Sequence, residues 1–332
     1  MVSNLDQSTA APSRHETGSG TVFLKSIGAY DVRVDGRVIT CAISNMLRKE
    51  LVYPIADPTS FRRRVMAVED ISVVDPVAVG DEVRFMLAED GNAMITEVLP
   101  RRSKLARVAA GAKPLEQVIV ANVDQVVIVF AAAQPAPKWN LLDRYLVSAE
   151  ACGLPALVCI TKLDLAEGDL QEEVAHYRQI GYRVMLTSTI SGAGISEFQS
   201  ALQDRISVFV GKSGVGKTSL LNAVEPGLGL RVNVVSQATS KGRHTTSHVQ
   251  MFPLNAGGSV VDTPGVREFG LWEVDDRDIA LYFPEMRPLV GHCQFGANCR
   301  HDTEPGCAIK RAVAQGRVGA RRYASMLKMG GE

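Results

Sequence analysis

Short apolar runs recur through the middle of the chain, and each has the length of a strand. Residues 206–210 read Ile-Ser-Val-Phe-Val and residues 155–160 read Pro-Ala-Leu-Val-Cys-Ile, while a third run ends near Leu186 and a fourth covers 258–261. Such runs are typical of buried strands. Residues 218–223, after the first run, look like the start of a helix. The middle of the chain is therefore predicted to be an α/β domain.

The first third of the chain has a different pattern, in which apolar and polar residues alternate. Residues 29–34 and 37–43 flank an Asp-Gly pair, a sequence that favours the turn of a β-hairpin. Residues 80–85 and 92–98 suggest a second pair of strands. Together they predict an all-β domain. Residues 1–20 are rich in Ser, Thr, Gly and Ala and are predicted to be a disordered tail.

The composition is that of a globular protein. The 332 residues are 46% hydrophobic, enough for the cores of two or three domains. The longest apolar run, near 126–133, is too short to span a membrane. The opening segment carries Asp6 and Glu16 and is unlike a secretory signal. We therefore expect no membrane partner and a cytoplasmic location.

Residues 211–218, Gly-Lys-Ser-Gly-Val-Gly-Lys-Thr, match the phosphate-loop pattern GxxxxGK[ST] at every fixed position. Glycines let successive backbone N–H groups turn toward phosphate oxygens at the positive end of a helix. We expect Lys217 to lie between the outer phosphates and the Thr218 hydroxyl to bind Mg²⁺. The predicted nucleotide contacts here are Gly211, Lys212, Ser213, Gly214, Val215, Gly216, Lys217, Thr218 and Ser219.

Residues 161–164, Thr-Lys-Leu-Asp, follow an apolar run and resemble the [NT]KxD element that reads guanine in GTPases. A carboxylate accepts both hydrogens on one edge of guanine, and we assign this role to Asp164. Lys162 is expected to pack along the base, and Thr161 stands where asparagine is usual. A backbone N–H near Ser188 is expected to reach the guanine oxygen. The predicted base contacts are Thr161, Lys162, Leu163, Asp164, Ser188 and Thr189. In isolation, this motif also fits an ordinary solvated turn.

Residues 262–265, Asp-Thr-Pro-Gly, follow another predicted strand and match the DxxG element. We expect Asp262 to reach Mg²⁺ through water and the Gly265 N–H to sense the γ-phosphate. The polar segment 240–248 before it should supply a threonine that closes on Mg²⁺. Thr246 is slightly preferred over Thr245 for this role.

Hydrolysis needs a positioned water, which is often held by a glutamine just after the DxxG element. In this chain that position is Val266, which has no polar group to orient water. His244 and His248 are the candidates that complete the site, although a solvated surface histidine is the alternative for each. We therefore predict slow intrinsic hydrolysis that rises strongly on a partner.

Three of the six cysteines gather near the C-terminus in the spacing Cys-x5-Cys-x-His-x5-Cys. This pattern predicts a closed structural zinc site, because four protein ligands leave no open position on the metal. The predicted ligands are Cys293, Cys299, His301 and Cys307, with His292 as a rival. The other cysteines, Cys41, Cys152 and Cys159, are predicted to be core residues without disulfides.

Positive and negative side chains balance at 36 each, so the chain is not a uniformly basic nucleic-acid binder. Basic residues nevertheless cluster in two places. One cluster follows the β domain and contains Arg101, Arg102, Lys104, Arg107 and Lys113. The other lies in the predicted C-terminal helix and contains Lys310, Arg311, Arg317, Arg321, Arg322 and Lys328. Both are predicted to contact RNA phosphates, with a solvated surface as the alternative.

The order of the motifs is unusual. In most GTPases the phosphate loop precedes the base-reading element, but here the element at 161 precedes the loop at 211 and the DxxG element at 262. The domain is therefore predicted to be circularly permuted, which is feasible where the ends of a domain lie close together. This order, the GRHTTSH and DTPGVREFGL segments and the cysteine-rich end resemble the RsgA (YjeQ) family of small ribosomal subunit biogenesis GTPases.

The resemblance covers nearly the whole chain after residue 20 and implies its fold. Expected are a tail at 1–20, an all-β OB-type barrel at 21–110, a permuted α/β P-loop GTPase domain at 111–274 and a mainly helical zinc-binding domain at 275–332. It implies GTP and GDP as ligands, Mg²⁺ and one structural Zn²⁺ as metals, and the small ribosomal subunit with its rRNA as partner. The implied activity is GTP hydrolysis that assists late subunit maturation and ends in release. A monomer is expected.

Two other functions remain open from the sequence. In the first, the chain is an rRNA-binding module that is switched by nucleotide binding, and hydrolysis is incidental. In the second, it is an enzyme that uses ATP, although Asp164 disfavours adenine.

Overall fold

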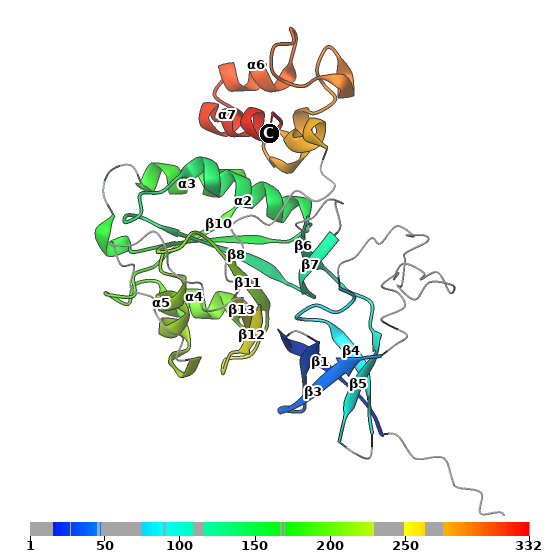
Figure 1. Cartoon of the computed structure of the whole chain (residues 1–332). Helices are drawn as coiled ribbons and strands as arrows, with labels where there is room; N and C mark the ends of the chain where they lie inside the picture. The colour runs from blue at the N-terminus through cyan, green and yellow to red at the C-terminus, as the bar shows by residue number, and fades with distance from the viewer. Residues whose placement is uncertain are drawn as a thin grey trace, which may run out of the picture.

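The computed structural model describes residues 16–26, 28–44, 47, 75–88, 91–108, 116–166, 168, 170–228, 249–262 and 275–331. A β-barrel, a central sheet flanked by helices and a small helical region follow one another along the chain (Figure 1). The barrel and the helical region lie on different sides of the central sheet. In the described part of the chain, no helix is both long enough and apolar enough to span a membrane.

The barrel closes from five strands. They are β1 (Glu16–Ser26), β2 (Ala29–Val34), β3 (Arg37–Ile43), β4 (Glu82–Leu87) and β5 (Ala93–Val98). The order β1-β2-β3-β5-β4 returns to β1, because β1 also pairs with β4, and β3 runs parallel to β5. Inward residues at alternate positions, such as Val32 and Ile95, form its core. The predicted hairpin and the OB-type barrel are confirmed.

The predicted tail is corrected at its end, because β1 begins at Glu16 and residues 16–20 pair with β4. The glycines that suggested disorder serve close packing instead. A Cβ at Gly18 would lie 2.5 Å from the Phe85 ring, and one at Gly20 would lie 2.5 Å from the Arg33 carbonyl oxygen. Composition alone does not distinguish a glycine needed for close approach from one in a disordered segment.

The central sheet contains the apolar runs predicted from the sequence. Its order is β10 (Arg183–Leu186), β9 (Ala156–Thr161), β8 (Gln125–Ala131), β11 (Ile206–Val210), β13 (Ser259–Asp262) and β12 (Gln250–Pro253). All adjacent pairs are parallel except β12 with β13. Because the strands are parallel, their carboxyl ends and the loops that follow them meet at one edge of the sheet.

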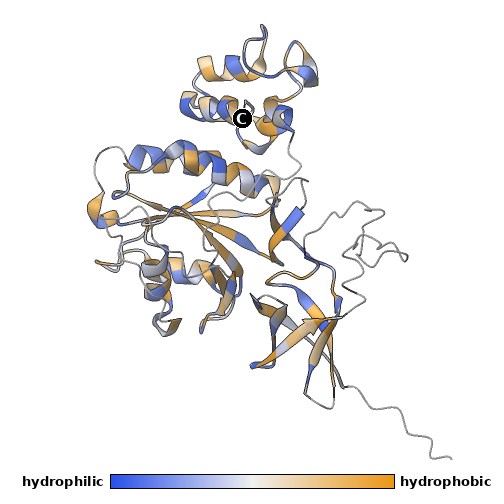
Figure 2. Cartoon of the chain, viewed as in Figure 1, coloured by the Kyte–Doolittle hydropathy of each residue, from blue (hydrophilic) through white to orange (hydrophobic). Residues whose placement is uncertain are grey.

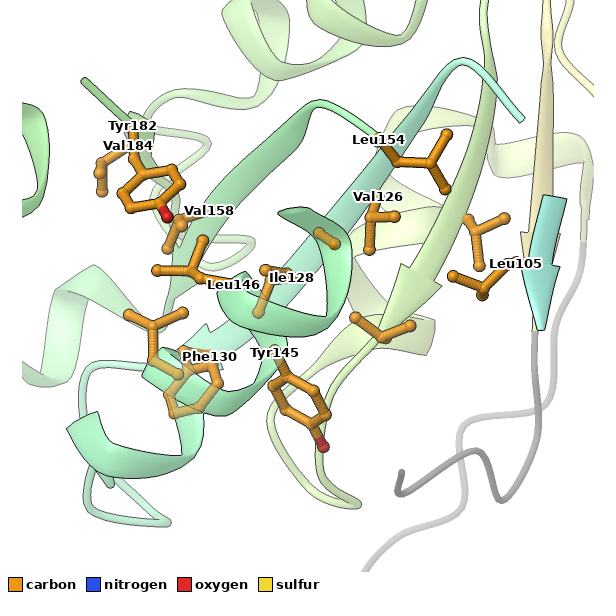
Figure 3. Packing of buried hydrophobic residues seen from close by; sticks show 14 of the residues in the cluster. Leu105, Val126, Ile128, Phe130, Tyr145, Leu146, Leu154, Val158, Tyr182 and Val184 are labelled. Atoms are coloured by element: carbon orange, nitrogen blue, oxygen red, sulfur yellow. The ribbon is translucent and has the colours of Figure 1, made fainter. Parts of the chain in front are cut away.

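Helices cover both faces of this sheet. On one face lie α2 (Trp139–Ala151) and α3 (Leu170–Ile180), and on the other α4 (Ile195–Leu202) and α5 (Lys217–Val224). Alternate residues of β8 face the two layers: Ile128 and Phe130 pack with Leu146 of α2, as Figure 3 shows, while Val127 and Val129 pack with the other layer. Both sides are thus buried, which explains the continuous apolar runs and the largely hydrophobic strands in Figure 2.

A hairpin of β6 (Lys104–Val108) and β7 (Glu116–Ala121) connects the barrel to the central sheet. A second link is direct. Leu24 of β1 pairs with Gln250 of β12, and Gln250 pairs on its other side with Asp262 of β13. The barrel and the central sheet are therefore one continuous hydrogen-bonded sheet.

The C-terminal region combines short 3₁₀ turns with two helices. These elements are η3 (Asp276–Tyr282), η4 (Arg287–Leu289), η5 (Gly296–Asn298), α6 (Ala308–Ala314) and α7 (Ala320–Met329). Its core includes Phe283 and Met326, and Val147 of α2 belongs to the same cluster. The region therefore packs on α2 rather than standing apart.

The cysteines outside the C-terminal cluster behave as predicted. Cys41 and Cys159 are buried, Cys152 is half-buried, and none of the three forms a disulfide. Burial raises the pKa of the Cys159 thiol to about 12, so this side chain stays a neutral part of the core.

Candidate nucleotide site and metal cluster

The phosphate loop joins β11 to α5 at the carboxyl edge of the central sheet. Gly211, Gly214 and Gly216 all have positive φ, at 148°, 82° and 94°. At Gly211 a Cβ would lie 2.3 Å from the Val129 carbonyl oxygen, so no larger residue fits without moving β8. Lys212 and Ser213 are exposed, and Thr218 and Ser219 lie half-buried in the first turn of α5. The loop thus has the conformation that its sequence predicts.

Lys217 folds back over this loop. Its Nζ donates to the carbonyl oxygens of Gly211 at 2.7 Å and Lys212 at 3.1 Å. Burial lowers the pKa of Lys217, while the negative charge of Asp262 acts in the opposite direction. Asp262 ends β13, next to β11 in the sheet. The phosphate-loop lysine and the DxxG aspartate therefore belong to one site.

The base-reading motif contacts the phosphate loop directly. Thr161, at the end of β9, is buried, and its hydroxyl lies within hydrogen-bonding distance of the carbonyl oxygens of Phe130 and Val215. The Nζ of Lys162 donates to the Gly214 carbonyl oxygen at 2.9 Å and also to that of Gln134. The motif and the loop, far apart in the sequence, are thus adjacent in space.

Asp164 lies in the short turn η1 (Leu163–Leu165), directly after this contact. The Ser188 hydroxyl donates to its Oδ1 and accepts the N–H groups of Ile190 and Ser191, both at 3.2 Å. The Ser188 N–H is bonded to the Ala193 carbonyl oxygen at 3.0 Å, and Thr189 is exposed. Ser188 therefore orients the Asp164 carboxylate, a contact that the sequence did not predict.

Several predicted residues lie outside the part of the chain that the structure describes: His244, Thr245, Thr246, His248, Gly265 and Val266. Their roles in closing on Mg²⁺, sensing the γ-phosphate and completing hydrolysis stay predictions.

The C-terminal cluster brings together Cys293, Cys299, His301 and Cys307, whose ligand atoms all lie within 4.8 Å of one another. The Sγ atoms of Cys293 and Cys307 are 3.8 Å apart, and each lies 3.4 Å from His301 Nδ1. Tetrahedral Zn²⁺, with its usual bond lengths, separates two sulfurs by about 3.8 Å and sulfur from nitrogen by about 3.5 Å. The donor set therefore fits zinc. His292, the rival ligand, is exposed and outside the cluster.

Backbone contacts hold these ligands in place. The N–H groups of Ala308 and Lys310 point to the sulfurs of Cys293 and Cys307, at 3.3 and 3.5 Å. The Tyr323 hydroxyl of α7 donates to the His301 carbonyl oxygen at 2.5 Å. Such contacts orient metal ligands and favour the charged thiolate. The cluster also ties the loop before α6 to α7.

The prediction that Arg322 faces RNA is wrong, and the half-buried Arg321 is paired within the chain. Arg322 is fully buried and donates to Asp143 at 2.9 Å and to Glu285 at 2.7 and 2.9 Å. Arg321 donates to Glu173 at 2.8 Å and to Asp143 at 3.2 Å. Asp143 lies on α2, 179 residues before Arg322, so the local charge pattern gave no sign of this pairing. These arginines fasten α7 to the central domain.

The basic cluster after the barrel is also largely paired internally. Arg101 forms two 2.7 Å hydrogen bonds to Asp81, a fully buried carboxylate. Arg102 pairs with Asp124 at 2.7 Å, and Lys104 pairs with Glu116 at 2.5 Å. The remaining predicted members are Arg107, which donates to Gln117, and Lys113, which lies outside the described residues. This cluster serves the junction between domains.

Comparison with known proteins agrees with this geometry. The family model "RsgA GTPase" matches residues 98–272. The small ribosomal subunit biogenesis GTPase RsgA of Gemmatimonas aurantiaca is 46% identical over 258 residues, covering 76% of this chain and 83% of the relative. The protein of the same name from Bacteroides fragilis is 33% identical over 314 residues, covering 93% and 95%.

Two solved structures extend the similarity to the whole fold. The crystal structure of YjeQ from Thermotoga maritima has a TM-score of 0.72 and 30% identity, covering 95% of this chain and 98% of that one. The structure of YloQ, described as a circularly permuted GTPase, has a TM-score of 0.66 and 30% identity, covering 97% of each.

The permuted order is thus seen in sequence and structure, since β9 and its base-reading motif precede β11 and the phosphate loop on one parallel sheet. Family membership brings with it a guanine nucleotide, Mg²⁺ and the hydrolysis of GTP. With a matching family model over residues 98–272 and relatives that align along most of their length, this chain belongs to the RsgA GTPase family.

Proposed function

We propose that this GTPase binds the small ribosomal subunit during late maturation and leaves after it has hydrolysed GTP. The partner follows from its relatives, which carry the name small ribosomal subunit biogenesis GTPase. The proposal of nucleotide binding rests on the hydrogen bond from Lys162 to the Gly214 carbonyl oxygen, because this bond holds the base-reading motif beside the phosphate loop.

In this proposal each motif has one task. Asp164, oriented by Ser188, accepts the guanine hydrogens. The Lys217 Nζ gives up its hydrogen bonds to the loop carbonyl oxygens and binds the β- and γ-phosphates instead. Thr218 and Thr246 bind Mg²⁺, with Asp262 acting through water. His244 or His248 positions the attacking water when the protein is bound to the subunit. The zinc bound by the cysteine cluster is structural.

The experiment is sedimentation of the protein with small ribosomal subunits in the presence of GTP, GDP or a non-hydrolysable GTP analogue. We expect retention with the analogue, release with GTP and GDP, and a hydrolysis rate that subunits raise strongly. Equal binding in all three nucleotide states would contradict a nucleotide-controlled cycle. Release on GTP binding without hydrolysis would support the alternative, an rRNA-binding module in which hydrolysis is incidental.

We further infer that the protein acts as a monomer in the cytoplasm. The closure of the barrel supports the monomer, because a closed barrel leaves no free strand edge of its own for a second chain. Size-exclusion chromatography with light scattering tests the monomer, and a dimer mass would reject it.

A further inference from the structure

A cavity of about 290 Å³ lies where the phosphate loop, the start of α2 and the end of α7 meet. Figure 1 shows α2 and α7 next to one another at this seam. Its polar lining residues are Lys138, Asn140, Arg144, Lys212, Ser325 and Lys328. Four of the six are cationic, and none of the residues that line the cavity carries a carboxylate. We call this cavity the seam pocket.

The cations of the seam pocket come from three separate elements. Lys212 belongs to the phosphate loop. Arg144 lies in α2, and Lys138 is the residue just before that helix. Lys328 belongs to α7. The three lysines are exposed, and Arg144 is half-buried. Folding thus brings three lysines that are distant in the sequence to one cavity, and like charges repel one another unless an anion lies among them.

Two carboxylates of α2, Asp143 and Glu150, are engaged in contacts within the described structure. Asp143 accepts from Arg321, Arg322 and the Ser325 hydroxyl, the last at 2.6 Å. Glu150, further along α2, pairs with Arg287 at 2.6 Å. The ion pairs that hold α7 and η4 on α2 therefore use these acidic groups, and the lysines remain at the rim of the pocket.

The first turn of α2 adds to the positive field. No acidic residue lies in this turn, and Lys138 at the N-cap makes no side-chain cap hydrogen bond. The backbone N–H groups at a helix start favour an anion. Asn140, exposed in this turn, offers an amide donor as well.

We propose that the seam pocket binds a phosphate group of an RNA backbone. Lysines bind phosphate as point charges, without the geometric selection of an arginine fork, and contacts of this kind position a protein on RNA without reading its sequence. A pocket of this volume is at the small end of ligand sites, which suits one backbone phosphate and its sugar. The inference rests on the proposed function, because it names a contact of that partner.

The seam pocket also touches the nucleotide site. The Lys212 carbonyl oxygen accepts a hydrogen bond from Lys217 Nζ at 3.1 Å, while the Lys212 side chain lines the pocket. When nucleotide phosphates take Lys217, this bond is released and Lys212 loses a restraint. RNA bound in the pocket therefore contacts the loop that carries the triphosphate on one side and α7 on the other.

The test is the double variant Lys138→Gln/Lys328→Gln, whose affinities for small ribosomal subunits and for protein-free rRNA are measured between 50 and 200 mM salt. The pocket holds one phosphate, so losing that contact should lower the slope of log affinity against log salt by about 0.9, and wild type should lose roughly threefold more affinity across this range than the variant. The control is Arg183→Gln/Arg205→Gln, which removes two exposed charges where β10 and β11 begin, at the opposite edge of the sheet.

The intrinsic GTPase rate, the affinity for GDP and the melting temperature should not change in either double variant. A salt slope of Lys138→Gln/Lys328→Gln equal to those of wild type and control overturns the inference and leaves the proposed function intact. A loss seen with whole subunits but absent with protein-free rRNA assigns the pocket to an acidic ribosomal protein and also overturns it. If wild type binds neither subunits nor rRNA, the proposed function fails, and the inference fails with it.

Discussion

Thr161 makes contacts that its place in the sequence motif does not predict. It stands where asparagine is usual in the base-reading motif. The structure gives its hydroxyl two buried carbonyl neighbours, at Phe130 and Val215, so it links β9 to β8 and the phosphate loop. The motif itself was readable because its residue types and spacing are fixed by guanine. The partners of Thr161 were not, because they depend on how distant strands pack.

Asp164→Asn tests the base assignment. The amide presents a donor where guanine also has one, so GTP binding should weaken by roughly 100-fold, the loss of two charged hydrogen bonds. Xanthosine triphosphate, which has a carbonyl oxygen at that position, should bind the variant better than GTP does. Competition with a fluorescent GDP analogue measures both, with the exposed Asp278→Asn as control. Unchanged preference for guanine in Asp164→Asn would reject the assignment.

Among the elements, the apolar runs predicted the strands well. The run 206–210 coincides with β11, and the hairpin 29–43 coincides with β2 and β3. Burial on both faces and an Asp-Gly turn are local signals, so the sequence carries them. The closure of the barrel and the pairing of β12 with β1 join distant segments, and no local pattern reports them.

The metal cluster gives a prediction for the elements around it. Removal of zinc with a chelator leaves three thiols and a histidine buried together, so the loop before α6 should unfold and release Tyr323 of α7. Hydrogen exchange should rise in residues 293–329 and stay unchanged in the central sheet. Cys299→Ser should lose the zinc measured by mass spectrometry, whereas Cys152→Ser, outside the cluster, should keep one ion per chain. Equal zinc in both variants would contradict the ligand set.

In the whole molecule, the charged residues proved least predictable. The basic stretches suggested exposed RNA-binding surfaces, yet half-buried Arg101 pairs with buried Asp81, and Arg322 forms a fully buried pair with Asp143. Net charge and local clustering say nothing about which acidic residue lies opposite. What the sequence did carry was motif identity and order, and these were enough for the domain type and its permutation.

Asp143→Ala tests how the C-terminal region is held. The change leaves buried Arg322 short of a partner and removes the acceptor of Tyr177 and Ser325, which should cost about 3–5 kcal/mol in the free energy of unfolding of the joined domains. Urea denaturation measures this. Arg102→Ala, which breaks an exposed pair with Asp124, should cost less than about 1 kcal/mol. Similar losses for both would show that the buried pairs do not fasten α7.

The pairing of Leu24 with Gln250 means that the barrel covers the start of the outer side of β12. A shortened protein that starts after residue 98 would leave the N–H and C=O groups on that side open to other chains. Such a fragment should self-associate through strand addition, which light scattering would detect and a proline at Gln250 would suppress. On this prediction the barrel protects the nucleotide domain from aggregation, whatever else the barrel binds.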